Sequence, residues 1–139
     1  MKEKQETSAF WKTFGLAALL WAALAAGSEL LFPSSAAAPA GAADLLRSCL
    51  VLPVAEELVF RGAALRLLRP LGRNAAILGQ AVLFAALHGS LQAKAYALGM
   101  GLLFGWVADR SGSLLPGILL HILNNGAVLA RCLAERGTP

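Results

Sequence analysis

Long runs of apolar residues, interrupted at only a few positions by charged or turn-forming residues, dominate this chain. The runs do not alternate apolar and polar residues with a period of two, so they indicate helices and not the strands of a barrel. We predict five helical segments, at residues 13–32, 44–68, 74–91, 94–109 and 114–133. A membrane-spanning helix needs about 17–25 residues, so most of these segments are long enough and the fourth is short. The pattern predicts an all-α, polytopic transmembrane bundle of about five helices.

The composition agrees with an integral membrane protein. Hydrophobic residues make up 58% and charged residues 14% of the 139 positions, whereas a soluble domain has about 45–50% and about 25%. The net charge of +4 reflects basic loops, so we expect a lipid bilayer and no nucleic acid as partner. Cys49 and Cys132 lack metal or redox spacing, and we interpret them as packing residues.

The segments divide the chain into four parts. Residues 1–12 form a tail, residues 13–43 hold the first helix and an Ala/Pro-rich linker, residues 44–133 form the bundle, and residues 134–139 form a second tail. Seven basic residues fall on the side of the N-terminus and four on the other side, which predicts a cytoplasmic N-terminus. The stretch ALAAGS in the first segment also fits a signal-peptide cleavage site, but we favour a retained helix.

Small residues predict close packing between two of the helices. Gly101 and Gly105 form a GxxxG pair, and Ala81 and Ala85 have the same spacing. Such pairs let helix backbones approach closely in a membrane. The general abundance of glycine and alanine explains the pattern equally well.

Six polar side chains lie at membrane depth within three of the segments: Glu56, Glu57, Arg61, His88, His121 and Asn125. Measured from one end of the bundle, the second, third and fifth segments carry them to depths of roughly 12–21 Å. Three helices therefore deliver polar groups to one layer, which is typical of a functional site. Helical spacing also pairs Glu57 with Arg61, places His121 and Asn125 on one face, and turns Glu56 away from Glu57.

These residue types predict hydrolysis of an amide by an activated water. A desolvated Glu56 can act as a general base, and His88 can orient the water. His121 and Asn125 can donate hydrogen bonds to a developing oxyanion. Glu56, His88 and His121 could also hold a divalent metal such as zinc, although the chain lacks HExxH. The residues leave the metal question open.

Each of these residues also has a structural interpretation when it is considered alone. Glu57 and Arg61 can be a structural ion pair, His88 a core histidine, and His121 with its asparagines a source of interhelical hydrogen bonds. Intramembrane acids and histidines also build proton relays in transporters. A relay needs polar groups strung across the bilayer, however, and here they gather in one layer.

Three short motifs resemble those of one membrane-protein family. EELVFR (56–61) resembles the EExxxR motif, FAALH (84–88) the FxxxH motif and HILNN (121–125) the HxxxN motif of the CPBP family. That family includes the type II CAAX prenyl proteases and the bacterial Abi-like intramembrane proteases. The resemblance covers residues 45–130, so the 44–133 bundle is similar to a minimal catalytic core of the family, closed by oligomerisation or by a partner.

The resemblance implies an intramembrane endopeptidase of glutamic or metallo type. Glu56 and His88 would activate the water, His121 and Asn125 would supply the oxyanion site, and Glu57, Arg61 and Phe84 would support it. The substrate would be a membrane-associated protein or peptide, in a protein-sorting or bacteriocin-immunity role at a bacterial inner membrane. The alternatives are a non-catalytic immunity or binding protein on the same scaffold and a proton-coupled transporter module.

Overall fold

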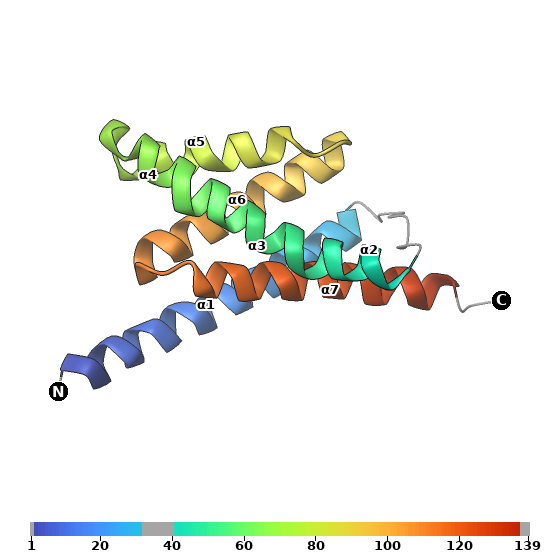
Figure 1. The fold of residues 1–139 in the computed structure, drawn as a ribbon, viewed down its shortest axis with the longest axis horizontal. Helices are drawn as coiled ribbons and strands as arrows, with labels where there is room; N and C mark the ends of the chain where they lie inside the picture. Colours follow the sequence, from blue (N-terminus) through green and yellow to red (C-terminus); the bar gives the residue numbers. More distant parts are fainter. Residues whose placement is uncertain (1, 32–40, 137–139) are drawn as a thin grey trace.

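The computed structural model describes residues 2–31 and 41–136, and these residues form helices joined by short turns, without a strand. Five helical segments run back and forth along the long axis of the molecule (Figure 1). The prediction of an all-α bundle of about five helices is confirmed. The first segment, α1 (Lys2–Leu31), starts well before residue 13 and continues through residues that the sequence pattern assigned to a tail.

The second segment is one continuous helical rod that contains two π-helical stretches. It comprises α2 (Ala42–Leu46), the π-helical η1 (Arg47–Val51), α3 (Leu52–Glu57), the π-helical η2 (Leu58–Ala64) and α4 (Leu65–Leu68). The first widened stretch directly precedes Pro53, which has no N–H to donate and whose ring clashes with the preceding turn. A 3₁₀ turn, η3 (Arg69–Leu71), and Gly72 at φ 102° then reverse the chain.

The third and fourth segments form a helical hairpin, and here the predicted boundaries are wrong. Helix α5 (Arg73–Ala86) ends before residue 91, and α6 (Leu91–Ser111) begins before residue 94. The side chain of Ser90 accepts a hydrogen bond of 3.1 Å from the N–H of Ala93 and so caps the start of α6. His88 therefore lies in the turn between the helices and not inside a helix, as the sequence pattern predicted.

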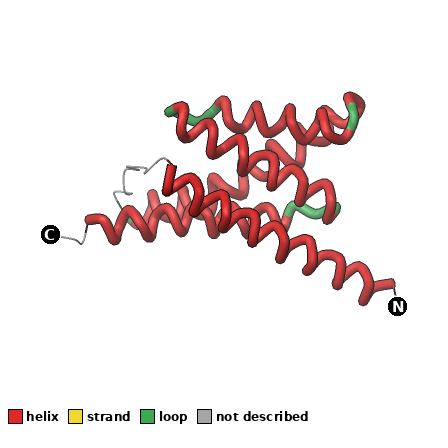
Figure 2. The backbone as a smooth tube through the Cα atoms, turned by 180° about the vertical axis from the view of Figure 1, so that it is seen from behind, coloured by secondary structure: helices red, strands yellow, loops and turns green. Residues whose placement is uncertain are grey.

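The fifth segment is α7 (Leu115–Arg136), and it returns along the bundle to the end that carries the C-terminus (Figure 1). The 69–72 and 112–114 turns lie at the end where α1 begins, and the turn that follows α5 lies at the opposite end. Seen from behind, α1 crosses the bundle diagonally (Figure 2). Its Ala17 packs into a buried cluster with Phe104 of α6 and Leu120 of α7.

Close packing between α5 and α6 follows from the small residues predicted to allow it. A Cβ atom added to Gly101 would lie 2.9 Å from the Cα atom of Ala81. A Cβ atom added to Gly105 would collide with the side-chain amide of Gln80. The GxxxG pair therefore contacts α5 directly. At the end of α6, Asp109 forms ion pairs with Arg69 and Arg73 and ties this helix to the turn before α5.

Two helices of the described part are long and apolar enough to cross a membrane, namely Thr7–Ser28 and Leu115–Ala134. Large apolar side chains also point outward, and Leu19, Leu67 and Leu91 are 71–81% exposed. An outer surface of this kind suits lipid contact. At 14 residues, α5 is about 21 Å long and shorter than a bilayer core of about 30 Å. That every segment crosses the membrane stays a prediction.

Candidate active site

A fully buried ion pair lies at the centre of the bundle. Glu57 at the end of α3 and Arg61 in η2 face each other across one helical turn, with 3.0 Å between Oε1 and Nη1. The Arg61 guanidinium carbon lies 4.6 Å from the ring centroid of Phe84 and 5.3 Å from that of Phe104. Aromatic faces attract a cation, so they stabilise the arginine where no water reaches it. The predicted Glu57–Arg61 pair is confirmed.

The carbonyl group of Gly101 also binds Arg61. Arg61 Nη2 donates to this carbonyl oxygen at 3.4 Å, and Gln80 Nε2 donates to the same oxygen at 2.8 Å. Gln80 is completely buried, and sequence reasoning missed it. Its helical spacing offered a signal, because positions 80, 84 and 88 share one face of the third segment. Gln80 therefore belongs to the shell of polar groups that holds the ion pair.

His121 lies between the two adjacent glutamates. Its Nδ1 atom is 3.0 Å from Glu57 Oε1, and its Nε2 atom is 3.5 Å from Glu56 Oε2. The Glu57 side chain is fully buried, whereas the Glu56 side chain is 35% exposed. The structure thus brings Glu56 and His121 together as predicted. It also adds a contact that the sequence did not suggest, since His121 touches the Glu57–Arg61 pair as well.

The protonation of the His121 ring follows from its neighbours. An ionised carboxylate can only accept a hydrogen bond, and Glu57 is ionised where it pairs with the guanidinium of Arg61. Nδ1 of His121 therefore carries a hydrogen and donates it to Glu57. A neutral His121 then has its lone pair on Nε2, the atom that faces Glu56. Nε2 of His121 therefore faces Glu56 Oε2 across 3.5 Å, and no hydrogen bond joins the two side chains in the described part of the chain.

His88 lies beyond the last turn of α5 and is half-buried. Its Nδ1 atom is 3.1 Å from the carbonyl oxygen of Phe84. A carbonyl only accepts, so Nδ1 carries the hydrogen and Nε2 keeps a lone pair. Within the described ranges, no hydrogen bond joins His88 to Glu56. Both imidazoles pack against Phe84 instead. The ring centroid of Phe84 is 4.9 Å from that of His88 and 5.8 Å from that of His121.

Asn125 does not bond to His121 but reaches the neighbouring rod. Its Nδ2 atom donates to the carbonyl oxygen of Ser48 at 2.9 Å, in the π-helical stretch before Pro53. A widened helical turn leaves backbone carbonyls without their usual N–H donors, and Asn125 supplies a donor for the carbonyl of Ser48. A side-chain amide has two N–H donors. Asn125 can therefore bind this carbonyl and still donate one hydrogen bond to a substrate.

Gly117 brings the start of α7 close to the ion pair, and sequence reasoning missed its importance. A Cβ atom at this position would lie 2.8 Å from Glu57 Oε2. Positions 117, 121 and 125 are spaced by four, so they share one face of α7. The helix can only place His121 against Glu57 because the preceding turn on this face carries no side chain.

The three residues predicted as metal ligands do not form a ligand set. Across residues 2–31 and 41–136, no three histidine, cysteine, aspartate or glutamate side chains are arranged to hold a metal ion. Glu56 and His121 are neighbours. His88 lies beyond the end of α5 and bonds to the backbone carbonyl of Phe84 within that helix. The observed geometry does not fit the predicted zinc site, and we derive no step through a metal.

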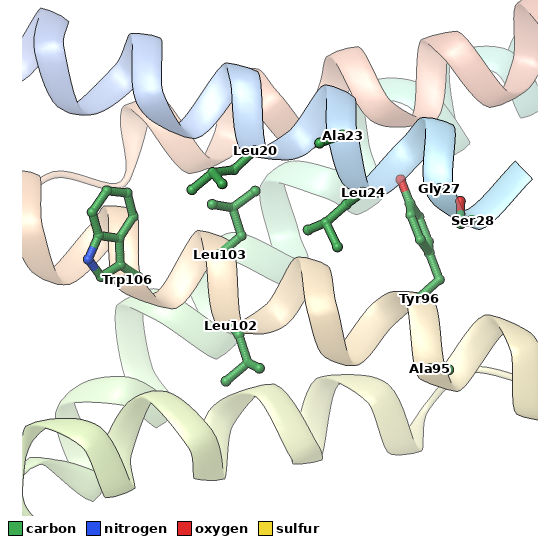
Figure 3. Close-up of a pocket in the computed structure, with 10 residues that line it drawn as sticks. All are labelled: Leu20, Ala23, Leu24, Gly27, Ser28, Ala95, Tyr96, Leu102, Leu103 and Trp106. Carbon is green, nitrogen blue, oxygen red and sulfur yellow. The ribbon is translucent and has the colours of Figure 1, made fainter. Parts of the chain in front are cut away.

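A separate apolar groove of about 810 Å³ lies between α1 and α6. Figure 3 shows Tyr96 reaching from α6 toward α1 at one end of this groove, and Trp106 at the other end, with leucines between them. The groove contains none of the acidic, imidazole or guanidinium groups described above. Tyr96 connects the groove to α7, because its hydroxyl group donates to Asn124.

Comparison with known protein families identifies one that this chain matches over most of the bundle. Residues 38–127, more than half of the chain, match the family described as "Type II CAAX prenyl endopeptidase Rce1-like". The matched range contains the acidic pair, Arg61, both histidines and Asn125. No curated protein and no solved structure matches this chain significantly.

Proposed function

Since this chain belongs to the type II CAAX prenyl endopeptidase family, we propose that it is an intramembrane endopeptidase that cleaves a membrane-associated protein or peptide with a water activated by Glu56. The family is one of membrane-embedded proteases, so proteolysis is the coarse function. One observation supports the finer proposal: His121 lies between a partly exposed and a fully buried glutamate, with 3.5 Å and 3.0 Å separations. In this arrangement Glu56 can act as the base and His121 as the proton carrier, and Glu57 holds His121 in place.

The reaction begins at Glu56. Its carboxylate takes a proton from the water as the water oxygen attacks the carbonyl carbon of the peptide bond. Nε2 of His88 has a lone pair that can accept the second hydrogen of this water and orient it. The 35% exposure of the Glu56 side chain leaves room for the water, whereas Glu57 is fully enclosed. Glu56 is therefore the chemical group and Glu57 the supporting group.

His121 then receives the proton from Glu56 at Nε2. The resulting imidazolium is stabilised by Glu57 through Nδ1, as a buried acid stabilises the histidine of a catalytic triad. Its Nε2–H and one N–H of Asn125 donate to the tetrahedral oxyanion. When the C–N bond breaks, the proton on Nε2 passes to the leaving nitrogen. The products are a carboxylic acid and an amine, and His121 returns to its neutral form.

The substrate class is part of the same proposal. A site inside a bundle with an apolar outer surface is accessible to a segment that is itself associated with the bilayer. We propose a sorting or bacteriocin-immunity role at a bacterial inner membrane, with the N-terminus in the cytoplasm. Assembly into a homo-oligomer that closes the small core also belongs to the proposal, and the mass of the detergent-solubilised protein measures it.

Quantitative proteomics of membrane-anchored C-termini tests this function. A strain that lacks the gene is complemented with the wild-type chain, with Glu56→Ala, His88→Ala or His121→Ala, or with the control Asp44→Asn. We expect specific C-terminal fragments to disappear in the three alanine strains and to persist in the control strain. Each variant must accumulate in the membrane to be scored.

Wild-type processing by Glu56→Ala would refute the proposed mechanism. If all three alanine strains stay immune to the bacteriocin without any processing, the chain is a non-catalytic immunity or binding protein. A proton flux in proteoliposomes that depends on the two histidines would instead indicate a transporter module. Treatment of the purified protein with a zinc chelator tests the open metal question, because loss of cleavage would show that a metal takes part.

A further inference from the structure

We propose that Asn124 is a positioning residue that sets the orientation of the Asn125 amide and thereby makes α1 part of the active site. This inference rests on the proposed function and assigns roles to Trp21 and Tyr96, which lie outside the three motifs, and to Asn124, which occupies a variable position of the third motif. Trp21 also lies outside the matched range of residues 38–127.

Three hydrogen bonds converge on Asn124, which is 9% exposed. Its Oδ1 atom accepts from Trp21 Nε1 at 3.0 Å and from the Tyr96 hydroxyl group at 2.5 Å. Its Nδ2 atom donates to Asn125 Oδ1 at 3.3 Å. An amide oxygen has two lone pairs, so Trp21 on α1 and Tyr96 on α6 occupy both. The indole N–H of Trp21 can only donate, so a flipped Asn124 would place its NH₂ group against another donor. The Asn124 amide therefore has one favourable orientation.

The orientation of Asn124 decides that of Asn125. Because Nδ2 of Asn124 points at Oδ1 of Asn125, the NH₂ group of Asn125 is directed to the other side, where it meets the carbonyl of Ser48. A flipped Asn125 would place its NH₂ against that of Asn124 and its oxygen against the Ser48 carbonyl. Both contacts would be repulsive. The network therefore keeps N–H donors, and not an oxygen, available to the oxyanion.

This arrangement gives α1 a role beyond membrane anchoring. The indole of Trp21 is the group through which α1 reaches the network, and the bond joins positions 103 residues apart in the sequence. Water competes poorly for such bonds in an apolar bundle. If α1 shifts or is absent, Asn124 loses one of its two donors, and the energy that opposes a flip of both amides falls.

The test uses the purified full-length chain and a fluorogenic peptide that contains a cleavage site found by the C-terminal proteomics. Trp21→Phe and Tyr96→Phe each remove one donor and keep the ring. Asn124→Asp keeps both acceptor contacts but cannot donate to Asn125. We expect kcat to fall about 5-fold to 10-fold in each ring variant, in line with one hydrogen bond. We expect a fall of at least 50-fold in Asn124→Asp, with KM changed less than twofold in all three.

Trp106→Phe is the matched control. Trp106 lies on α6 and lines the groove between α1 and α6 together with Tyr96. Its indole N–H has no hydrogen-bond partner among the described residues, so kcat should stay at the wild-type value. Equal kcat values for Trp21→Phe and Trp106→Phe would overturn the inference. So would a loss in Trp21→Phe that appears only as a higher KM or as lower protein recovery, because either result indicates a structural role.

The failure of the inference can be told apart from failure of the proposed function. If wild-type protein cleaves, Glu56→Gln does not cleave, and the Trp21, Tyr96 and Asn124 variants keep full kcat, only the inference is wrong. If Glu56→Gln cleaves as well as the wild type, the proposed function is wrong. Ultraviolet resonance Raman spectra provide a readout without turnover, since the Trp21 indole band should shift in Asn124→Leu and stay unchanged in Asn125→Leu.

Discussion

At the scale of single residues, the site combines groups that sequence spacing could pair with groups that only the packing of helices brings together. Glu57 and Arg61 are one helical turn apart, so their pairing follows from the sequence alone. The bond from His121 to Glu57 joins positions 64 apart, and no spacing rule indicates which glutamate a distant imidazole approaches. The sequence also predicted Asn125 as a partner of His121, but it could not reveal that a widened turn at Ser48 would bind the Asn125 amide.

The buried ion pair leads to a prediction about stability. Arg61→Met should lower the free energy of unfolding by about 3–5 kcal/mol, because it leaves the Glu57 charge buried without its cation. The double variant Glu57→Gln/Arg61→Met should recover most of this loss, since neither charge remains. Denaturation with sodium dodecyl sulfate in mixed micelles measures both values. Activity should be lost in both variants, because Arg61→Met removes the cation that positions the Glu57 carboxylate and the double variant also removes the anion at His121 Nδ1.

Equal destabilisation in the single and double variants would contradict this account. It would mean that the side-chain volume or the cation–π contacts of Arg61 with Phe84 and Phe104, and not charge pairing, determine the stability. Recovery of stability without recovery of activity is the result that separates the two roles of the pair.

Gly117→Ala should impair the site with little loss elsewhere. The added methyl carbon would meet Glu57 Oε2 at 2.8 Å, so the start of α7 or the carboxylate must move. We expect a loss of about 1–3 kcal/mol in unfolding free energy, as for other overpacked positions, and at least a tenfold loss of cleavage. The control is Gly126→Ala in the same helix, where nothing lies within 4 Å of the new atom. Wild-type cleavage by Gly117→Ala would show that His121 does not depend on this approach.

At the scale of elements, the apolar pattern predicted how many helices there are better than it predicted where they end. The turn between α5 and α6 contains Leu87 and is followed directly by Leu91. Its glycine and serine are also common in membrane helices, so hydropathy did not separate it from the helices. The cap at Ser90 carried the missing information. The wrong helix boundary changed the interpretation of His88. It lies in the turn and bonds to the carbonyl of Phe84 near the end of α5.

The hairpin itself depends on Gly101. In Gly101→Ala the new atom would lie 2.9 Å from the Cα atom of Ala81, and backbone cannot yield as a flexible side chain can. We expect α5 and α6 to separate slightly, with a cost of about 1–3 kcal/mol. The Gly101 carbonyl would then move away from Arg61 and Gln80, and cleavage should fall. Gly99→Ala is the control, because its new atom would lie at an ordinary 3.5 Å from Leu24. Equal unfolding free energies for the two variants would contradict the close approach.

At the scale of the whole molecule, the order of the helices places successive turns at alternate ends of the bundle (Figure 1). Sequence depths for the glutamates, His121 and Asn125 could therefore be compared from one end, and the structure brings His121 into contact with both glutamates. The place of α1 was beyond prediction, because an apolar first helix can serve as an anchor, a signal sequence or a packed element. Only its contacts with α6 and α7 reveal the last of these.

The alternation also predicts which end faces the cytoplasm. The end where α1 begins carries Lys12, Arg66, Arg69, Arg73 and Arg110, so the positive-inside rule places it in the cytoplasm. In a background with Cys49→Ala and Cys132→Ala, a single cysteine at position 94 should react with a membrane-impermeant maleimide on intact cells. A single cysteine at position 110 should react only after the membrane is permeabilised. Both positions are exposed, so a difference in labelling reports sidedness and not burial. Labelling of both on intact cells would contradict the membrane-crossing of α6, and the reverse pattern would invert the bundle, while the contacts around Glu56 and His121 would stay the same.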